Sequence, residues 1–571
     1  MLFTSILILI VAKALHSQYI SSILFTRIAA IVFIYAGALS LNAFYIQSIG
    51  SGIGIYSGLF HVTTVTQFLD SFIFLIGALI LLAWPSISNS PMFNSLYPVQ
   101  NDTEQSENIT VRINNASEYS LIVLFSTLGA SLLVSSADLI SMYLSIELQS
   151  FGVYILSTLY KDSESSTSAG LKYFLLGGLS SCLILLGAAL IYSYTGLTNF
   201  ESIYSLVSVS DSPSITQGLS LGLIIIIVGF LFKIAAAPLH NWSPDVYDDT
   251  PTIVTIWLTI MPKISIIIFL LELYSSVGQI GIITNKVSIT EVLELLVNVS
   301  SIETHIISEG VQIIPANSGY LLKNLILISS LLSLLIGTVV GLAQSRIKRL
   351  LTYSTISHVG FILLALAINS EQSIDSLIFY IIQYSITNLN TFLIILALGY
   401  ILKSSILNNK LNYSALGQKG TERDIKYISE LKGQFFTNPL LSLSLTVCLF
   451  SMAGIPPLMG FFGKQFVLYS AIQSGYYFMS IVGIIVSIIS ASYYLKIIRV
   501  LHSTTVEQEL ETKELTATNP NLINSSNYNS TITNFHSFLI TTLTLTILIF
   551  VLKPSLLLNS TQLLSLSLFY Y

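Results

Sequence analysis

The chain has 571 residues, of which 53% are hydrophobic and only 9% are charged. Soluble domains carry about 25% charged residues, so this composition excludes a water-soluble protein and indicates a polytopic membrane protein. A net charge of -5 without a long basic run gives no basis for nucleic-acid binding, and only two cysteines exclude a disulfide framework or a cysteine-ligated metal cluster.

The predicted elements are membrane spans, because a helix that crosses a bilayer needs about 20 mostly apolar residues. Fourteen such segments follow one another along the chain: 2–15, 23–46, 67–84, 119–136, 138–160, 170–195, 219–242, 252–274, 322–344, 350–369, 374–402, 440–471, 477–501 and 536–558. The first of them is the shortest. The expected fold is therefore all-α, with about 14 transmembrane helices.

Polar connections divide the spans into groups. The long ones, which are rich in Ser, Asn and Thr, are residues 86–118, 275–321, 403–439 and 502–535. We expect them to be surface loops or segments that bind partner subunits. The resulting groups are an N-terminal three-helix segment, two groups of five spans and a C-terminal span, at residues 1–85, 119–274, 322–501 and 536–571.

The Lys and Arg residues predict the orientation, because positively charged connections face the cytoplasm-like side of a membrane. With fourteen spans, the odd-numbered connections share one side, and that side holds Arg112, Lys161, Arg346, Lys348, Arg349, Lys403, Lys410, Lys419, Arg423, Lys426, Lys432 and Lys513. The other side and its helix ends hold only Lys286, Lys323 and Lys553. We expect the odd-numbered loops to face the cytoplasm-like side, which is the matrix in a mitochondrion, and both termini to face the opposite side.

Charged residues inside the spans are the most informative feature. Those near the middle of spans five, seven, eight and twelve are Glu147, Lys233, Lys263 and Lys464, and Lys172 lies nearer the start of span six. Left unpaired, five such groups would cost on the order of 10 kcal/mol, so they must be paired, hydrated or neutralised. One acid and several lysines at similar depth indicate a polar axis through the bundle, and a buried lysine is suited to holding and releasing a proton.

Two further residues have simple structural alternatives. Lys172 can extend along its helix to the membrane surface, as lysines near helix ends do. His358, in the string YSTISHVGF, can be a buried histidine of the bundle core. Both remain candidates for the polar axis.

Helix-breaking residues stand beside two of the lysines. Pro238 follows Lys233 by five residues, and the pair Pro456–Pro457 precedes Lys464. Proline interrupts the helical hydrogen bonds, and irregular backbone at membrane depth is tolerated only where it is packed in protein or lines a hydrated cavity. Interrupted spans at corresponding places in two halves are typical of inverted-repeat transporters. We therefore predict two inverted five-helix repeats, with discontinuous helices seven and twelve and with Lys464 corresponding to Lys233.

Four strings in this order resemble one known family. They are LSIELQS (144–150), FKIAAAPLHNWSPDVYDDTP (232–251), RLLTYSTISH (349–358) and AGIPPLMGFFGK (453–464). They are similar to the antiporter-like membrane subunits of respiratory complex I, NADH–ubiquinone oxidoreductase, and among these to the chain 2 family. The sister chain 4 family has a glutamate where this sequence has Lys464. The long loops are similar to those of fungal mitochondrial members.

The resemblance implies roles for matching residues. Glu147 would form an ion pair with Lys233 and modulate its protonation, Lys263 would be the central relay, and Lys464 would be the distal lysine. His358 and Lys172 would lie along a hydrated path. The implied function is proton translocation across the mitochondrial inner membrane, coupled to electron transfer from NADH to ubiquinone. NAD, FMN, iron–sulfur clusters and ubiquinone would be bound by other subunits, so the chain would be a translocase subunit without a cofactor of its own.

The implied partners are the other membrane-arm subunits, including the sister antiporter-like subunits, with membrane lipids and with accessory subunits on the polar loops. The N-terminal sequence shows neither a secretory signal nor an Arg-rich transit pattern, which is typical of a protein made in the compartment that houses it. Two other functions stay open at this point. The chain could be part of a cation/proton antiporter independent of NADH, or a structural subunit whose lysines are remnants of an antiporter ancestor.

Overall fold

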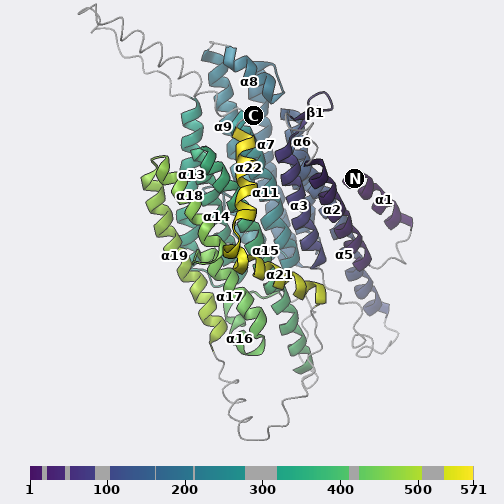
Figure 1. The fold of residues 1–571 in the computed structure, drawn as a ribbon. Coiled ribbons are helices and arrows are strands. Elements are labelled where there is room, and N and C mark those ends of the chain that lie inside the picture. The colour runs from purple at the N-terminus through teal and green to yellow at the C-terminus, as the bar shows by residue number, and fades with distance from the viewer. Residues whose placement is uncertain are drawn as a thin grey trace, which may run out of the picture.

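The fold is a bundle of long helices that run side by side (Figure 1). It was obtained as a computed structural model, which describes residues 1–15, 22–44, 52–83, 103–160, 163–209, 213–276, 318–409, 424–503 and 533–569. The polar connections predicted around 86–102, 277–317, 410–423 and 504–532 lie outside the described residues.

The first half of the chain contains one small hairpin among its helices. Its elements are α1 (Leu2–Leu15), α2 (Ser22–Phe44), β1 (Ile53–Ile55), β2 (Phe60–Val62), α3 (Thr64–Leu82), α5 (Thr103–Val134), α6 (Leu139–Ser157), α7 (Glu164–Thr195), α8 (Phe200–Val209), α9 (Pro213–Lys233), α10 (Trp242–Asp249) and α11 (Thr252–Ser276). The two strands pair antiparallel, Gly54 opposite His61.

The second half has helices and, among its described residues, no named strand. Its elements are α13 (Ser318–Leu342), α14 (Ile347–Ile368), α15 (Glu371–Asn409), the 3-10 turn η4 (Ile428–Leu431), α16 (Gln434–Thr437), α17 (Pro439–Ala453), α18 (Met459–Gln473), α19 (Tyr477–His502), α21 (Asn534–Ile549), η5 (Phe550–Leu552) and α22 (Ser555–Phe569).

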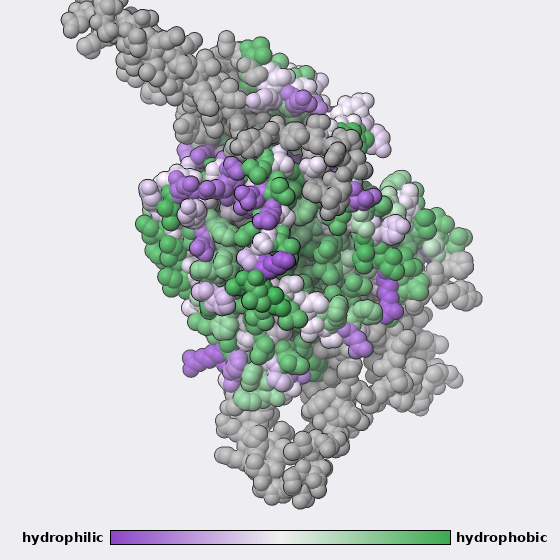
Figure 2. Space-filling model, in the orientation of Figure 1, coloured by the Kyte–Doolittle hydropathy of each residue, from purple (hydrophilic) through white to green (hydrophobic). Residues whose placement is uncertain are grey.

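The helices confirm an all-α membrane protein. Ten of them are long and apolar enough to cross a membrane, and four shorter apolar helices within the described residues are Leu2–Leu15, Glu118–Val134, Gln217–Lys233 and Pro439–Ala453. On the face shown in Figure 2, hydrophobic side chains dominate the middle of the molecule, and many hydrophilic ones lie toward its two ends. This distribution fits a protein that contacts lipid around its middle.

Some boundaries differ from those that hydropathy predicts. Helix α5 begins at Thr103, inside the range predicted as a polar loop, and α15 extends to Asn409, into the next one. The single span predicted at 536–558 is two helices, α21 and α22, separated at Lys553 and Pro554, where proline cannot continue the helix. Hydropathy finds the apolar stretches but not how far polar residues prolong a helix.

The connections alternate between two ends of the bundle. At one end the hairpin, the α5–α6 turn and the α7–α8 turn are joined by backbone bridges, Phe60 with Ser136 and Asp138 with Asn199. At the other end the turn before α14 pairs with the segment before η4 through the bridge of Arg346 with Tyr427. Among the described residues, connections two, four and six therefore meet at the first end, and connection nine meets the described part of connection eleven at the second.

Helices α11 and α14 form the centre of the bundle. In both helices an apolar stretch of 18 residues is entirely buried inside the protein. In α19 and α21 only 33% of the residues of such a stretch are buried. A helix that is hydrophobic all round is expected in such a central position. The ionisable residues in the middle of these helices, Lys263 on α11 and His358 on α14, are therefore shielded from lipid by other helices.

The helix pair α5–α6 and the helix pair α13–α14 share one packing register. Where α5 crosses α6, a side chain on Gly129 would overlap the backbone of Gln149, and one on Gly152 would contact Ser126. Where α13 crosses α14, Gly337 is equally close to Ser357, and Gly360 to Leu334. The four positions of the first crossing are 126, 129, 149 and 152, and those of the second are 334, 337, 357 and 360. The spacing along the chain is the same in both sets. In this register the counterpart of Glu147 is Thr355, and the counterpart of Ser150 is His358.

Candidate functional site

The first part of the site is an ion pair between α6 and α9. Lys233 Nζ lies 3.3 Å from Glu147 Oε1, and the two side chains are only 5% and 14% exposed. The same ammonium donates to Ser150 Oγ at 2.7 Å and to Ser181 Oγ at 3.0 Å. The Ser181 hydroxyl in turn donates to Glu147 Oε1. Two hydroxyl groups thus complete the hydrogen bonding of a pair that would be costly to bury alone.

Lys233 stands at the point where helix seven is interrupted. It is the last residue of α9, and α10 begins only at Trp242. Ala235 has a φ of 61°, a left-handed conformation that costs a non-glycine residue about 1–2 kcal/mol. The break frees the Phe232 carbonyl, which accepts hydrogen bonds from Ala235 N and from Trp242 Nε1. The predicted interruption is present, and the side chain of Pro238 lies exposed within it.

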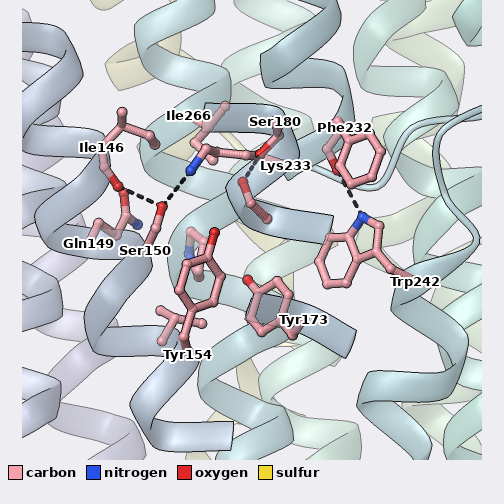
Figure 3. A pocket seen from close by; sticks show the side chains of 13 residues that line it. Ile146, Gln149, Ser150, Tyr154, Tyr173, Ser180, Phe232, Lys233, Trp242 and Ile266 are labelled. Atoms are coloured by element: carbon pink, nitrogen blue, oxygen red, sulfur yellow. Dashed lines mark hydrogen bonds between the residues drawn. The ribbon is translucent and has the colours of Figure 1, made fainter. Parts of the chain in front are cut away.

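A small cavity lies beside this ion pair. Its volume is about 20 Å³, room for about one water molecule, and Lys233, Gln149, Ser150, Tyr154 and Pro262 are among its lining residues. Figure 3 shows Lys233 reaching across to Ser150 above the rings of Tyr154 and Tyr173. The lining comes from α6, α7, α9, α10 and α11, so the cavity joins the ion pair to the helix that carries Lys263.

The second part is Lys263, on the central helix α11. Its side chain is buried, at 2% residue exposure, and Nζ donates to Thr355 Oγ1 at 3.0 Å. The ammonium also lies 5.5 Å from the centre of the Tyr247 ring. Thr355 occupies on α14 the place that Glu147 has on α6, so Lys263 meets a hydroxyl where Lys233 meets a carboxylate.

A pair of hydrogen bonds links the helices that carry these two parts. Gln149 on α6 and Ser265 on α11 are both buried, and they exchange two hydrogen bonds, of 2.8 and 3.0 Å. Gln149 is two residues from Glu147, and Ser265 is two residues from Lys263. The amide and hydroxyl therefore hold α6 and α11 together close in sequence to Glu147 and to Lys263.

Helix α14 continues the polar axis beyond Lys263. Thr355, His358 and Phe361 are spaced three residues apart, so they share one face of the helix. His358 is buried, with Nδ1 2.7 Å from the Tyr380 hydroxyl and Nε2 3.4 Å from that of Tyr494. On this face Thr355 contacts Lys263, and His358 is hydrogen-bonded to Tyr380. The ring of Phe361 contacts the ammonium of Lys464.

The third part is Lys464, at the second broken helix. Its buried ammonium donates to the carbonyl oxygens of Met452 and Ala453, both at 2.9 Å, and lies 5.8 Å from the centre of the Phe361 ring. These carbonyls end α17, where the helix dipole and the unpaired acceptors favour a cation.

The two broken helices place their lysines differently. Lys464 belongs to α18, after the break, whereas Lys233 ends α9, before its break. Pro456 and Pro457 lie between α17 and α18 with exposed side chains. Each ammonium nevertheless faces the interruption of its own helix, and the predicted correspondence of Lys464 with Lys233 stays a prediction.

Gly460 allows the two pieces of this helix to pack closely. Its N–H donates to Ser451 Oγ at 3.1 Å, and a side chain there would overlap the Ser451 carbonyl. We expect Gly460→Ala to separate α18 from α17 and to cost about 1–3 kcal/mol of stability. Thermal unfolding of the purified assembly measures this. Gly178→Ala is the control, because a side chain at Gly178 meets no atom within 4 Å; equal melting curves for both variants would contradict the prediction.

Lys172 does not join the axis. Its side chain is 53% exposed and pairs with Asp245 at 3.3 Å, at the end of the bundle where the odd-numbered connections meet. Arg349 pairs with the same aspartate, and Arg346 with Asp248, whose hydrogen bond raises the pKa of the Arg346 guanidinium. Lys172 thus belongs to a charged surface at that end.

Several polar residues of the site were not predicted from the sequence. They are Gln149, Ser150, Ser181, Tyr247, Ser265, Thr355 and Tyr380. Ser, Thr and Tyr are common throughout this chain, so their presence in a span is a weak signal. Gln149 was the exception, because an uncharged amide two residues from Glu147 in the middle of a span needs a partner. Among the described residues, no group of three His, Cys, Asp or Glu side chains converges to hold a metal ion.

Comparison with known proteins identifies the family. Residues 136–297 and 303–490, more than half of the chain, match the family model described as NADH:quinone oxidoreductase/Mrp antiporter, TM. The chain belongs to this family. The matched residues contain Glu147, Lys233, Lys263, His358 and Lys464, all the predicted site residues of the axis.

Members of the family with high similarity are respiratory subunits. The chain is 49% identical to NADH-ubiquinone oxidoreductase chain 2 of Rhizopus oryzae, over 100% of both chains. It is 36% identical to NADH-quinone oxidoreductase subunit N of a Wolbachia strain, over 67% of this chain and 69% of the relative.

Two solved structures share the fold. A chain of respiratory complex I from Thermus thermophilus matches with a TM-score of 0.65 at 22% identity, over 98% of this chain and 99% of that one. A chain of the Mrp complex from Dietzia sp. matches with a TM-score of 0.71 at 17% identity, over 100% and 96%. Together with the helices of the bundle, these likenesses confirm the predicted antiporter-like fold.

Proposed function

We propose that this chain is the chain 2 membrane-arm subunit of respiratory complex I. In this role it takes part in moving protons across the mitochondrial inner membrane, coupled to electron transfer from NADH to ubiquinone. Its full-length likeness to the Rhizopus oryzae chain 2 supports the assignment to complex I rather than to a free-standing antiporter. The chain is then a subunit of a proton-translocating oxidoreductase whose redox chemistry takes place on other subunits.

The observation that carries the translocation role is the buried row of ionisable residues. The row begins with the ion pair of Glu147 on α6 and Lys233 on α9. It continues with Lys263 on α11, His358 on α14 and Lys464 on α18. Structural stability alone gives no reason for this, because isolated buried ammonium groups cost energy. Lys263 and Lys464 hydrogen-bond to neutral oxygens only, among the contacts of the described residues. A group held this way is suited to changing its protonation state.

Each residue then has a distinct role. Glu147 holds the charge of Lys233, Lys263 is the central relay, and Lys464 releases or receives the proton at the far end. His358, hydrogen-bonded to Tyr380, lies between the last two and is the further candidate. Lys172, exposed and paired with Asp245, would act only as a surface charge near the start of the path. The breaks at Pro238 and at Pro456–Pro457 would open the helices where Lys233 and Lys464 exchange protons.

The proposal also covers the orientation of the chain in the membrane, its division into units and its partners. The odd-numbered loops, with their Lys and Arg residues, would face the matrix, and both termini would face the intermembrane space. The units would be residues 1–85, 119–274, 322–501 and 536–571, with polar loops between them. Partners would be the other membrane-arm subunits, including the sister antiporter-like ones, with lipids around the bundle and accessory subunits on the loops. NAD, FMN, iron–sulfur clusters and ubiquinone would be bound elsewhere in the complex.

The assignment to complex I is tested by native separation of mildly solubilised membranes. We expect the chain to migrate with the band that oxidises NADH. Migration alone, or with small hydrophobic partners only, would contradict the proposal. That result would favour an antiporter independent of NADH, and Na⁺/H⁺ exchange in vesicles would then be the activity to measure.

A further inference from the structure

Tyr247, on the short helix α10, contacts the central lysine. Its side chain is buried, at 1% residue exposure, and the Lys263 ammonium lies 5.5 Å from the centre of its ring. A cation over an aromatic face is attracted by the ring, more strongly when both are shielded from water. The ring therefore favours one position of the ammonium, beside the hydroxyl of Thr355.

The hydroxyl of Tyr247 makes a second contact with the same helix. It donates to the Leu258 carbonyl at 3.3 Å. In a regular helix this carbonyl would accept from the N–H four residues later, but that residue is Pro262, which has none. The Tyr247 hydroxyl thus replaces the backbone donor that is missing at Pro262, and Pro262 is the residue before Lys263.

Tyr247 is also connected to the break at Lys233. Trp242, at the start of α10, donates to the carbonyl of Phe232, and its ring lies edge-on to Tyr247 at 5.8 Å. The Tyr247 carbonyl accepts from the Thr255 hydroxyl of α11 at 3.2 Å. These contacts connect the backbone at the Lys233 break, through α10, to α11, the helix that bears Lys263.

We infer that Tyr247 is the positioning residue of Lys263, and that it makes the place of the Lys263 ammonium depend on the helix break beside Lys233. This inference rests on the proposed function, since it concerns proton transfer along the same axis. The ring holds the ammonium, and the hydroxyl fixes the kinked turn of α11. Neither contact requires Tyr247 to exchange a proton itself.

The test compares variants of the chain assembled in its complex, in sealed membrane vesicles. The measurements are NADH turnover, proton pumping per NADH, and complex abundance by native separation. We expect Tyr247→Leu, which removes ring and hydroxyl, to lower pumping about tenfold, and Tyr247→Phe, which removes the hydroxyl alone, to lower it about threefold. Unchanged pumping in Tyr247→Leu would overturn the inference.

Tyr119→Phe is the matched control. Tyr119 is a buried tyrosine of α5 whose hydroxyl also donates to a carbonyl of α11, that of Ile253, at 3.3 Å. Residue 257, four positions after Ile253, is Trp257 rather than proline, so this carbonyl has a regular backbone donor within reach. We expect pumping to be unchanged in this variant, and a loss equal to that of Tyr247→Phe would overturn the inference.

The variant Pro262→Ala separates a positioning role of the Tyr247 hydroxyl from a packing role. Pro262→Ala returns an N–H to the Leu258 carbonyl, so the Tyr247 hydroxyl is no longer needed there. We expect Tyr247→Phe to cost about threefold in the native background and almost nothing beside Pro262→Ala. Equal losses in both backgrounds would assign the hydroxyl a packing role and overturn the inference, and this comparison stands even if Tyr247→Leu fails to assemble.

Lys263→Gln in the same vesicles distinguishes the two proposals. If that variant pumps normally, the proposed function of the axis fails. If it loses pumping while every Tyr247 variant pumps normally, only the positioning role of Tyr247 fails.

Discussion

Replacing Lys263 by glutamine is expected to lower proton pumping per NADH by about tenfold or more without weakening the protein. The Lys263 ammonium donates to Thr355 Oγ1, and glutamine keeps an N–H donor on a side chain of similar size, so we expect the local packing to persist. It cannot exchange a proton as the ammonium does, and a positioned proton-transfer group contributes about 10²–10⁴-fold to a reaction rate. Pumping per NADH in sealed vesicles, with complex abundance from native separation, measures the effect.

The thermal stability of the complex should not fall with pumping in Lys263→Gln. A lysine at the centre of a span costs about 2.5–3.5 kcal/mol on an insertion scale, and a neutral amide costs less. We therefore expect the Lys263→Gln complex to melt at the same temperature as the native one or higher. Lys323→Gln is the control, because Lys323 also lies over an aromatic ring, 5.0 Å from that of Tyr476, but outside the axis. Joint loss of stability and pumping at Lys263 would point to a structural role instead.

Glu147→Gln is expected to lower pumping about tenfold while most of the complex still assembles. The amide keeps the shape of the carboxylate and can accept the Ser181 hydrogen bond, but it leaves Lys233 without its counter-charge. Breaking one side of a buried ion pair typically costs about 3–5 kcal/mol. Part of the effect will therefore be a lower melting temperature, so the single variant alone cannot assign the loss to proton transfer.

The charge-neutral double variant Glu147→Gln/Lys233→Gln resolves this. It removes both charges, so the melting temperature should recover toward that of the native complex, while pumping should stay low because no titratable pair remains. Recovery of pumping together with stability would show that the pair only supports the fold. Lys233→Ala with normal turnover, pumping and assembly would lead to the same conclusion, that the lysines are remnants of an antiporter ancestor.

The sequence was sufficient to predict most of the architecture and the charged residues of the site. Glu147, Lys233, Lys263 and Lys464 stood out because ionisable groups are rare within spans, and Pro238 and Pro456 marked the two broken helices next to them. These signals work because the bilayer makes each such residue costly. The N-terminal hairpin was missed, since short elements outside apolar stretches leave little trace in hydropathy. The division of the last span into α21 and α22 was missed because hydropathy alone does not register the break at Lys553 and Pro554.

The partners of the charged residues could not be predicted in the same way. Lys263 depends on Tyr247, which belongs to the broken helix of the first repeat, and on Thr355, on the second helix of the other repeat. Which tyrosine or threonine meets a lysine is decided by the packing of helices distant in sequence. The repeat register also stays hidden in the sequence, because it rests on the backbone contacts of Gly129 and Gly337 rather than on similar side chains.

The charged end of the bundle has a consequence for how the chain is built during synthesis. Asp424 accepts from the backbone N–H of Thr252, at the start of α11, and pairs with Lys348, which is only 3% exposed. Thr252 leaves the ribosome long before Asp424 does. Until then the first turn of α11 lacks this acceptor, and Lys348 lacks its counter-charge. The helices up to α11 can therefore enter the membrane early, but the start of α11 reaches its final form only when Asp424 arrives, so a chain truncated before Asp424 should be an early target for proteolysis.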